Sequence, residues 1–137
     1  MLTIPVEIRK SELHGYGVFA VEDIRRGVVV WMFHPGLDRR VGMFAVKYCE
    51  PRAQRFIWER GYINPSHPDE IVLCMDEAQF LNFPRPDQPS NLCLGGLQDG
   101  EHILLAALDI PAGEELTVPP ESDADFQRKM QRYDPGR

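Results

Sequence analysis

The sequence predicts one α+β domain in which β-structure dominates, and three observations support this. Short runs rich in β-branched and aromatic residues recur along the 137 residues, separated by glycine and proline. Few stretches have helical boundaries; the clearest is residues 51–60, where Pro51 suits the first helical position and Gly61 the residue past the end. A chain of this length fits a single domain with its own core, so residues 1–137 are treated as one domain.

The remaining elements follow in chain order. Residues 3–9 alternate apolar and polar side chains as a half-buried strand does, and the continuous apolar run 28–33 predicts a buried strand. Asp76 with Gln79 three residues later has the form of a capping box, which predicts one helical turn ending near Asn82. Further expected elements are strands at residues 18–21, 70–75, 91–94, 102–108 and 115–118, a turn at Gly95 and Gly96, and a last helix over residues 122–133 capped by Ser122.

Composition restricts the class of partner. The net charge of −6 argues against nucleic acid, because phosphate contacts need a basic face; Arg52, Arg55 and Arg60 are the candidates for a local basic patch. The apolar runs are too short to cross a bilayer and no signal peptide is visible, so we expect a cytoplasmic protein without a membrane partner. Three widely spaced cysteines fit neither a disulfide framework nor a zinc site, and no metal is expected.

A Gly-x-Gly motif, Gly15-Tyr16-Gly17, lets backbone approach a ligand closely, although turn chemistry alone would explain it as a hairpin turn. The residues around it favour the first explanation. From Val6 to Gly27 the chain reads VEIRKSELHGYGVFAVEDIRRG. This resembles the opening segment of SET domains, in which a strand, Lys-Ser and GxGVFA are followed by an isoleucine and a glycine before the next strand.

Two later blocks strengthen the resemblance. Leu81-Asn82, with Pro89-Ser90-Asn91 after it, is similar to the family's NHSxxPN region, and residues 107–117, ALDIPAGEELT, are similar to its DIPxGEELT segment. The three blocks stand in the family's order and cover the first quarter of the chain and most of residues 76–118. The chain therefore resembles SET-domain protein-lysine methyltransferases, and residues 34–70 correspond to the family's variable insert.

The resemblance implies a SET-type fold of several short sheets, with a C-terminal pseudoknot formed by the Asn82 segment and a terminal helix. It implies S-adenosylmethionine, or its product S-adenosylhomocysteine, as cofactor. The glycine loop would lie against the donor, Asn82 would contact it through its amide, and Trp31 and the Phe83 backbone would lie near the adenine. The implied cofactor-binding residues are Gly15, Tyr16, Gly17, Trp31, Asn82 and Phe83.

The implied partner is a protein or peptide that presents a lysine, and a homodimer is left open. Several acidic residues gather beside the expected lysine entrance, where they would attract a basic peptide. Acids favoured by the dipole at a helix N-terminus are the other explanation for this cluster. Its members are Glu114, Glu115, Glu121, Asp123 and Asp125.

The chain departs from the family at two positions. Phe83 stands where the family has histidine, and Pro120 stands where it has the catalytic tyrosine. Loss of a positioned catalytic group commonly costs roughly 10²–10⁴-fold in rate. Tyr133 in the last helix is the substitute considered, and no catalytic residue is assigned. The hypotheses are a lysine methyltransferase of doubtful activity, an impaired module that binds the donor or a protein, and a structural protein without ligand.

Overall fold

The strands of the computed structural model, which describes residues 1–133 and the side chains of residues 1–130, form three small antiparallel sheets. The first sheet pairs β1 (Val6–Lys10) with β2 (Tyr16–Ala20). The second has the order β3-β7-β6, from β3 (Val29–Trp31), β7 (Glu101–Ala106) and β6 (Leu92–Gln98). The third pairs β4 (Arg39–Gly42) with β5 (Glu70–Leu73). This is the β-dominant α+β architecture expected from the sequence.

The helices are few and short. They are α1 (Met43–Val46), α2 (Pro51–Arg60) and α3 (Phe126–Tyr133), with 3-10 turns η1 (Glu77–Phe80) and η2 (Pro120–Ser122). The prediction for α2 is confirmed at both ends. Asp76 caps η1 as predicted, because its Oδ1 accepts a hydrogen bond from the Ala78 amide at 3.1 Å. None of the described helices is long and apolar enough to cross a bilayer.

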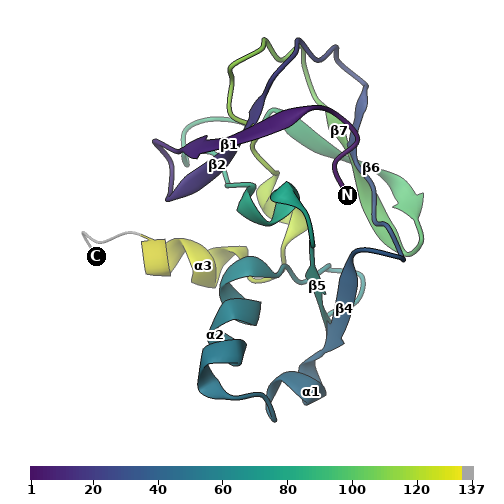
Figure 1. The fold of residues 1–137 in the computed structure, drawn as a ribbon, viewed down its shortest axis with the longest axis vertical. Helices are drawn as coiled ribbons and strands as arrows, with labels where there is room; N and C mark the ends of the chain where they lie inside the picture. Colours follow the sequence, from purple (N-terminus) through teal and green to yellow (C-terminus); the bar gives the residue numbers. More distant parts are fainter. Residues whose placement is uncertain (134–137) are drawn as a thin grey trace.

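Two apolar clusters hold these elements together. The larger joins the first two sheets to the chain near Leu116, and Val18, Val30 and Leu92 within it are fully buried. The smaller lies inside the part formed by β4, β5, α1 and α2, where Ile57 of α2 packs with its neighbours. Figure 1 shows this part as a separate lower portion of the molecule, and it corresponds to most of the variable insert.

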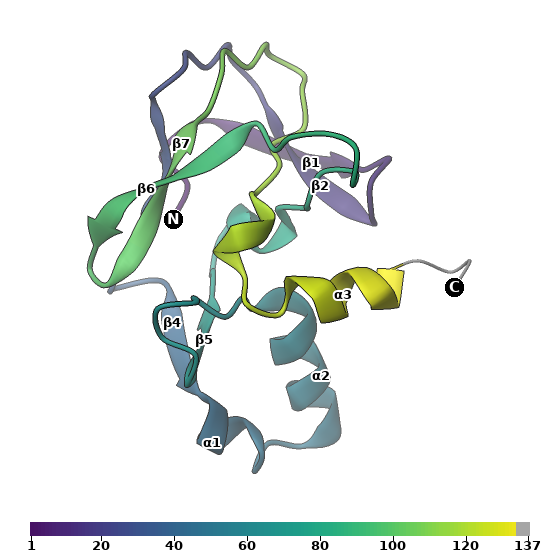
Figure 2. The ribbon, with the colours of Figure 1, turned by 180° about the vertical axis from the view of Figure 1, so that it is seen from behind.

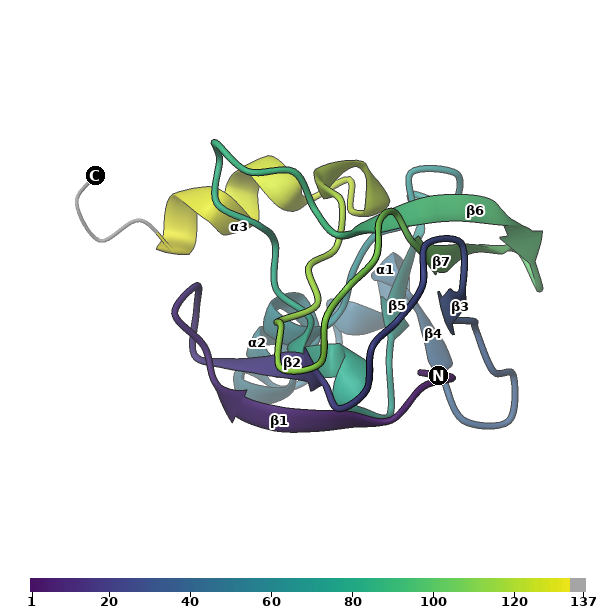
Figure 3. The ribbon, with the colours of Figure 1, turned by 90° about the horizontal axis from the view of Figure 1, so that it is seen from above.

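The expected pseudoknot is present. Asn82 forms a parallel bridge with Thr117, and the Val118 amide donates to the Asn82 carbonyl at 3.0 Å. On the other side, the Leu92 amide donates to the Thr117 carbonyl at 3.1 Å, and Asn91 Oδ1 accepts from the Thr117 amide at 2.8 Å. The segment at Thr117 and Val118 therefore lies between the chain at Asn82 and the chain at Asn91. Figure 3 shows the course of these parts of the chain from above.

The turn predicted at Gly95 and Gly96 is wrong. Strand β6 continues through both glycines to Gln98, with a register shift, and the chain reverses at Asp99 and Gly100, where φ is 52° and 81°. The reason for glycine at position 95 is packing, since a Cβ there would lie 2.6 Å from Cγ1 of Ile103 on the neighbouring strand. The dipeptide Gly95-Gly96 in the sequence could not reveal this contact, because it depends on the pairing of two strands.

Two expectations for the C-terminal region are also wrong. The last helix begins at Phe126 and not at residue 122, and Ser122 does not cap it. Pro119 and Pro120 lead into the turn η2, where the Ser122 hydroxyl donates to the Pro119 carbonyl at 2.6 Å. The strand expected at residues 115–118 is reduced to isolated bridges, such as the one between Phe19 and Glu115.

A buried ion pair attaches α3 to the rest of the molecule. Figure 2 shows α3 next to the end of α2. Lys129 is only 7% exposed, its Nζ pairs with the carboxylate of Asp123, and it also donates to the Gly61 carbonyl at 2.5 Å. Asp123 in turn accepts from the Ile63 amide at 3.0 Å. These contacts join α3 to the chain that follows α2, so the helix closes one side of the domain.

We expect Asp123→Ala to lower the free energy of unfolding by about 3–5 kcal/mol, because the Lys129 ammonium would then be buried without a counter-charge. Adding Lys129→Met should recover part of this loss, but not all, since the Ile63 amide still loses its acceptor. Urea unfolding measures both changes. Arg55→Gln, which breaks the exposed pair with Glu59, is the control and should leave the midpoint unchanged. A wild-type midpoint for Asp123→Ala would contradict the anchoring role.

Candidate functional site

A cavity of about 790 Å³ lies where the glycine loop, the Asn82 segment, the end of α2 and the chain from η2 to α3 meet. Its volume falls within the range of roughly 300–1,000 Å³ that is typical of small-molecule sites. Apolar and aromatic side chains form much of its wall, among them Trp31, Tyr62, Phe80 and Phe83. The proline-rich loop after Asn82 borders the cavity without closing it.

Five of the six residues predicted to bind the cofactor line this cavity: Gly15, Tyr16, Trp31, Asn82 and Phe83. They come from three separate parts of the sequence, and the fold brings them together. Gly15 has a φ of 48°, in the left-handed region that favours glycine. Gly17 does not line the cavity. Binding of the donor by these residues remains a prediction.

The amide of Asn82 fixes the shape of the glycine loop. Its Nδ2 lies 3.0 Å from the carbonyl oxygen of His14 and 3.0 Å from that of Tyr16, and it also donates to Glu115 Oε1 at 2.9 Å. The two amide hydrogens are therefore shared among acceptors of the protein itself. Only Oδ1 is left to meet a ligand, and as an acceptor it suits an ammonium group.

Glu115 explains why position 17 is glycine. Both carboxylate oxygens of Glu115 accept from the Ser11 hydroxyl at 2.8 Å, and Oε1 also accepts from Asn82. A Cβ on Gly17 would lie 1.9 Å from that Oε1 atom. Gly17 therefore makes room for a carboxylate that holds the loop and the C-terminal segment together.

The acidic cluster predicted beside the lysine entrance is largely used inside the protein. Glu115 holds Ser11 and Asn82, Asp123 pairs with Lys129, and Asp125 accepts from Arg128 Nε at 2.7 Å. Asp123 and Asp125 are themselves buried. These three carboxylates stabilise the fold, which leaves fewer acids to attract a basic peptide.

Tyr62 and Cys74, on the inner wall of the cavity, were not predicted as site residues. The rings of Tyr62 and Trp31 meet edge to face with centroids 6.3 Å apart, and the Tyr62 hydroxyl donates to Glu101 Oε1 at 3.1 Å. Burial and then the charge of Glu101 raise the pKa of Tyr62 far above its ordinary value. Burial likewise raises the pKa of the Cys74 thiol. Both groups therefore stay protonated at neutral pH.

No motif in the sequence assigns a site role to Tyr62 or Cys74. Tyr62 lies in the variable insert, and Cys74 directly follows strand β5. The bridge between Tyr62 and Val72 places the tyrosine against β5. The indole nitrogen of Trp31 is buried without a hydrogen-bond partner, so Trp31 meets the cavity through ring carbon atoms. An aromatic wall of this kind suits a flat apolar group.

The structure offers no hydroxyl at the position where the resemblance expects the catalytic tyrosine. Pro120 opens η2 and is not among the residues that line the cavity. Tyr133 ends α3, and its side chain lies outside the described residues. Of the tyrosines with described side chains, Tyr16 and Tyr62 line the cavity and Tyr48 does not.

Several solved structures are similar to this fold. A humanized mutant of Chaetomium thermophilum Polycomb Repressive Complex 2 bound to an inhibitor has 22% identity and a TM-score of 0.63, over 91% of this chain and 16% of that one. The same complex in an autoinhibited conformation bound to S-adenosylmethionine has 20% identity and a TM-score of 0.64, over 94% and 17%. A Plasmodium falciparum protein assigned as a histone methyltransferase has 17% identity and a TM-score of 0.55, over 85% and 93%.

These likenesses show a SET-type fold for this chain. The chain spans only 16–17% of the length of the Polycomb chains that it matches. No family model matches the sequence, and no curated protein matches it significantly. The comparisons therefore establish the architecture, and the chemistry has to be argued from the site.

We expect Gly17→Ala to lower the free energy of unfolding by about 1–3 kcal/mol, because its Cβ would displace the Glu115 carboxylate. In a Glu115→Ala background, the same change should cost less, since the obstructing atoms are gone. Chemical denaturation of the four proteins measures this coupling. Gly96→Ala is the control, because a Cβ there meets nothing within 4 Å. Equal costs in both backgrounds would show that Glu115 is not the reason for glycine at this position.

Proposed function

We propose that this chain binds S-adenosylmethionine or S-adenosylhomocysteine in the cavity. The observation that carries the proposal is that the glycine loop, Asn82, Phe83 and Trp31 line one cavity, with the loop fixed by the Asn82 amide. The solved complex bound to S-adenosylmethionine, which has a similar fold, supports the same ligand class. Bound here, this cofactor would supply a methyl group that a nucleophile can accept.

The residues present fit such a ligand. The volume of about 790 Å³ has room for the whole cofactor. Phe83 leans against Phe126 with ring centroids 4.7 Å apart, which keeps its ring at the edge of the cavity. Trp31 and Phe83 offer aromatic surface to an adenine, and Asn82 Oδ1 offers an acceptor to an ammonium group.

We further propose that methyl transfer from this site to a lysine is slow. A lysine with a pKa near 10.4 must lose its proton before it can attack, which costs about 4–5 kcal/mol at neutral pH. The resemblance expects a tyrosine hydroxyl that orients the amine, and Pro120 has none. The buried hydroxyl of Tyr62 already donates to Glu101 and is not available as a base.

The alternative function is a module that binds the cofactor or a protein without turnover. Pro120 favours this alternative, whereas the retained glycine loop and Asn82 favour cofactor binding in either case. The protein partner of both functions remains a lysine-bearing protein or peptide, and nothing in the site selects a particular one. Two measurements separate these functions.

Isothermal titration should show saturable binding of one S-adenosylhomocysteine, with a Kd between about 1 µM and 1 mM. Asn82→Asp should weaken it at least about tenfold, because the loop carbonyls of His14 and Tyr16 lose their donor and Glu115 meets a second carboxylate. Leu97→Gln, at an exposed position outside the cavity, should leave the affinity unchanged. A flat titration at millimolar ligand would refute the proposal.

Radiolabelled S-adenosylmethionine tests turnover on basic peptides and on a cell lysate. We expect labelling by the wild-type protein to stay near background, and Pro120→Tyr to raise the initial rate at least about tenfold if the missing hydroxyl is the defect. Heat-inactivated protein is the control for background. Strong labelling by the wild-type protein would contradict slow transfer, and Tyr133→Phe would then test the tyrosine of the last helix.

A further inference from the structure

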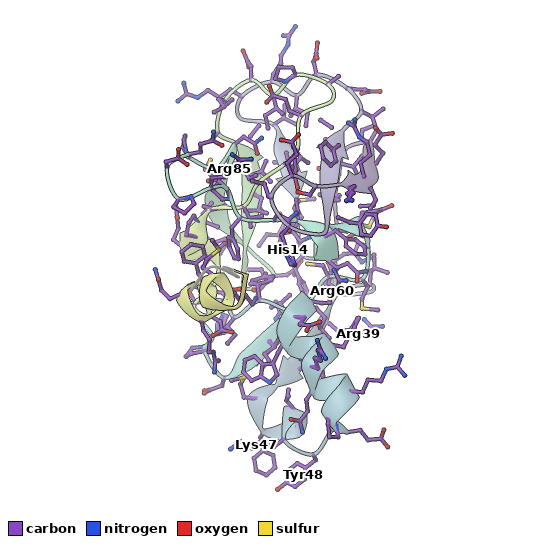
Figure 4. The ribbon with its side chains drawn as sticks, turned by 90° about the vertical axis from the view of Figure 1, so that its left-hand side faces the viewer. His14, Arg39, Lys47, Tyr48, Arg60 and Arg85 are labelled. Carbon is purple, nitrogen blue, oxygen red and sulfur yellow. The ribbon has the colours of Figure 1, made fainter. Side chains whose placement is uncertain are left out.

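The cavity extends between two distant parts of the fold. At one end it is lined by the turn between β1 and β2, which carries His14 and Gly15, and Figure 4 views the molecule from the side of this turn. At the other end it is lined by His102 at the start of β7 and by Asn64 and Ser66 after α2. Figures 1 and 3 show the β1-β2 turn and the β6-β7 hairpin on opposite sides of the molecule. The glycine loop proposed to bind the cofactor belongs to the first end, so the second end is left for another group.

His102 lies on the face of β7 that borders the cavity. Residues two apart on a strand point to the same face, and both His102 and Leu104 line the cavity. Leu94, which pairs with Leu104 across the hairpin, lines it as well. The imidazole is therefore a polar group beside an apolar wall, which is the arrangement that orients ligands in small-molecule sites.

An irregularity in the hairpin fixes the hydrogen-bonding state of this ring. The pairing of β6 with β7 shifts register between Leu94 and Leu97, and within this interval the Gly95 carbonyl lies 2.8 Å from His102 Nδ1. A carbonyl oxygen only accepts, so Nδ1 carries the hydrogen, and in the neutral ring Nε2 holds the lone pair. In the described part of the chain Nε2 has no partner, and it is open to solvent. The hairpin thus presents a hydrogen-bond acceptor in a fixed orientation.

We propose that His102 Nε2 accepts a hydrogen bond from the amine of the methyl acceptor, and that it selects for acceptors with such a donor. This inference rests on the proposed cofactor binding. The hydroxyl of Tyr62 already donates to Glu101, and Pro120 has no hydroxyl. Glu121 also lines the cavity and forms no ion pair with a described residue, so its charge favours an ammonium. The bond holds the ammonium without deprotonating it, in agreement with slow transfer.

The test uses analogues of S-adenosylhomocysteine in which nitrogen replaces the sulfur and carries an alkyl arm, with or without a terminal amine. Isothermal titration with arms of increasing length measures the affinity of each pair. At the best length, the wild-type protein should bind the analogue with the amine at least about tenfold more tightly than its plain alkyl counterpart, because a hydrogen bond to a charged group is worth more than the desolvation that it requires.

Two variants separate recognition of the amine from support of the hairpin. His102→Asn keeps an amide donor close to where Nδ1 stood but lacks Nε2, whereas His102→Leu lacks both. Both should abolish the preference for the amine and leave the affinity for S-adenosylhomocysteine within about twofold. Thermal melting of His102→Asn should stay at the wild-type value. His67→Leu, a histidine outside the cavity lining, is the control and should keep the preference.

The outcomes distinguish this inference from the proposed function. If S-adenosylhomocysteine and its analogues all fail to bind the wild-type protein, the proposed function fails. If they bind but the amine brings no gain at any arm length, cofactor binding stands and the role of His102 is refuted. If His102→Leu abolishes the preference and His102→Asn retains it, the histidine only supports the hairpin, which also refutes the role.

Discussion

The hydrogen bonds around the side chain of Asn82 hold both the fold and the cavity. Its amide reaches carbonyls 66 and 68 residues earlier in the chain and a carboxylate 33 residues later, while its own backbone bridges Thr117. The carboxylate of Glu115 accepts a hydrogen bond from the same amide. It fits there because Gly17 has no side chain that would occupy the space. A substitution at any of these positions is therefore expected to change the glycine loop and the pseudoknot together.

The same arrangement decides which chemistry the cavity favours. Asp123, which lines the cavity, pairs with Lys129, and the buried Tyr62 donates to Glu101. Glu115, outside the lining, holds Ser11 and Asn82. With proline where a hydroxyl is expected, and with Tyr62 already donating to Glu101, neither residue supplies a free hydroxyl that could orient an amine. We therefore expect the site to hold a ligand more readily than to deprotonate a lysine ammonium.

The insert contributes more to the site than its sequence suggests. Its local signals predicted α2, through Pro51 and Gly61, but gave no reason to assign a site role to Tyr62. Arg60 appeared only as one member of a basic stretch. Both residues border the cavity because the end of α2 packs between β5 and α3, where Lys129 donates to the Gly61 carbonyl.

The sequence by itself determined the β-rich class, the order of the three blocks that form the pseudoknot, the cap of η1 by Asp76, and the absence of a hydroxyl at Pro120. These follow from local propensity or from the chemistry of one side chain. Tertiary structure alone decided that Gly95 is a packing glycine within a strand and that Ser122 serves a turn instead of a helix. It also decided which charges remain available in the cavity. Each of these depends on contacts between distant residues, which a local pattern does not encode.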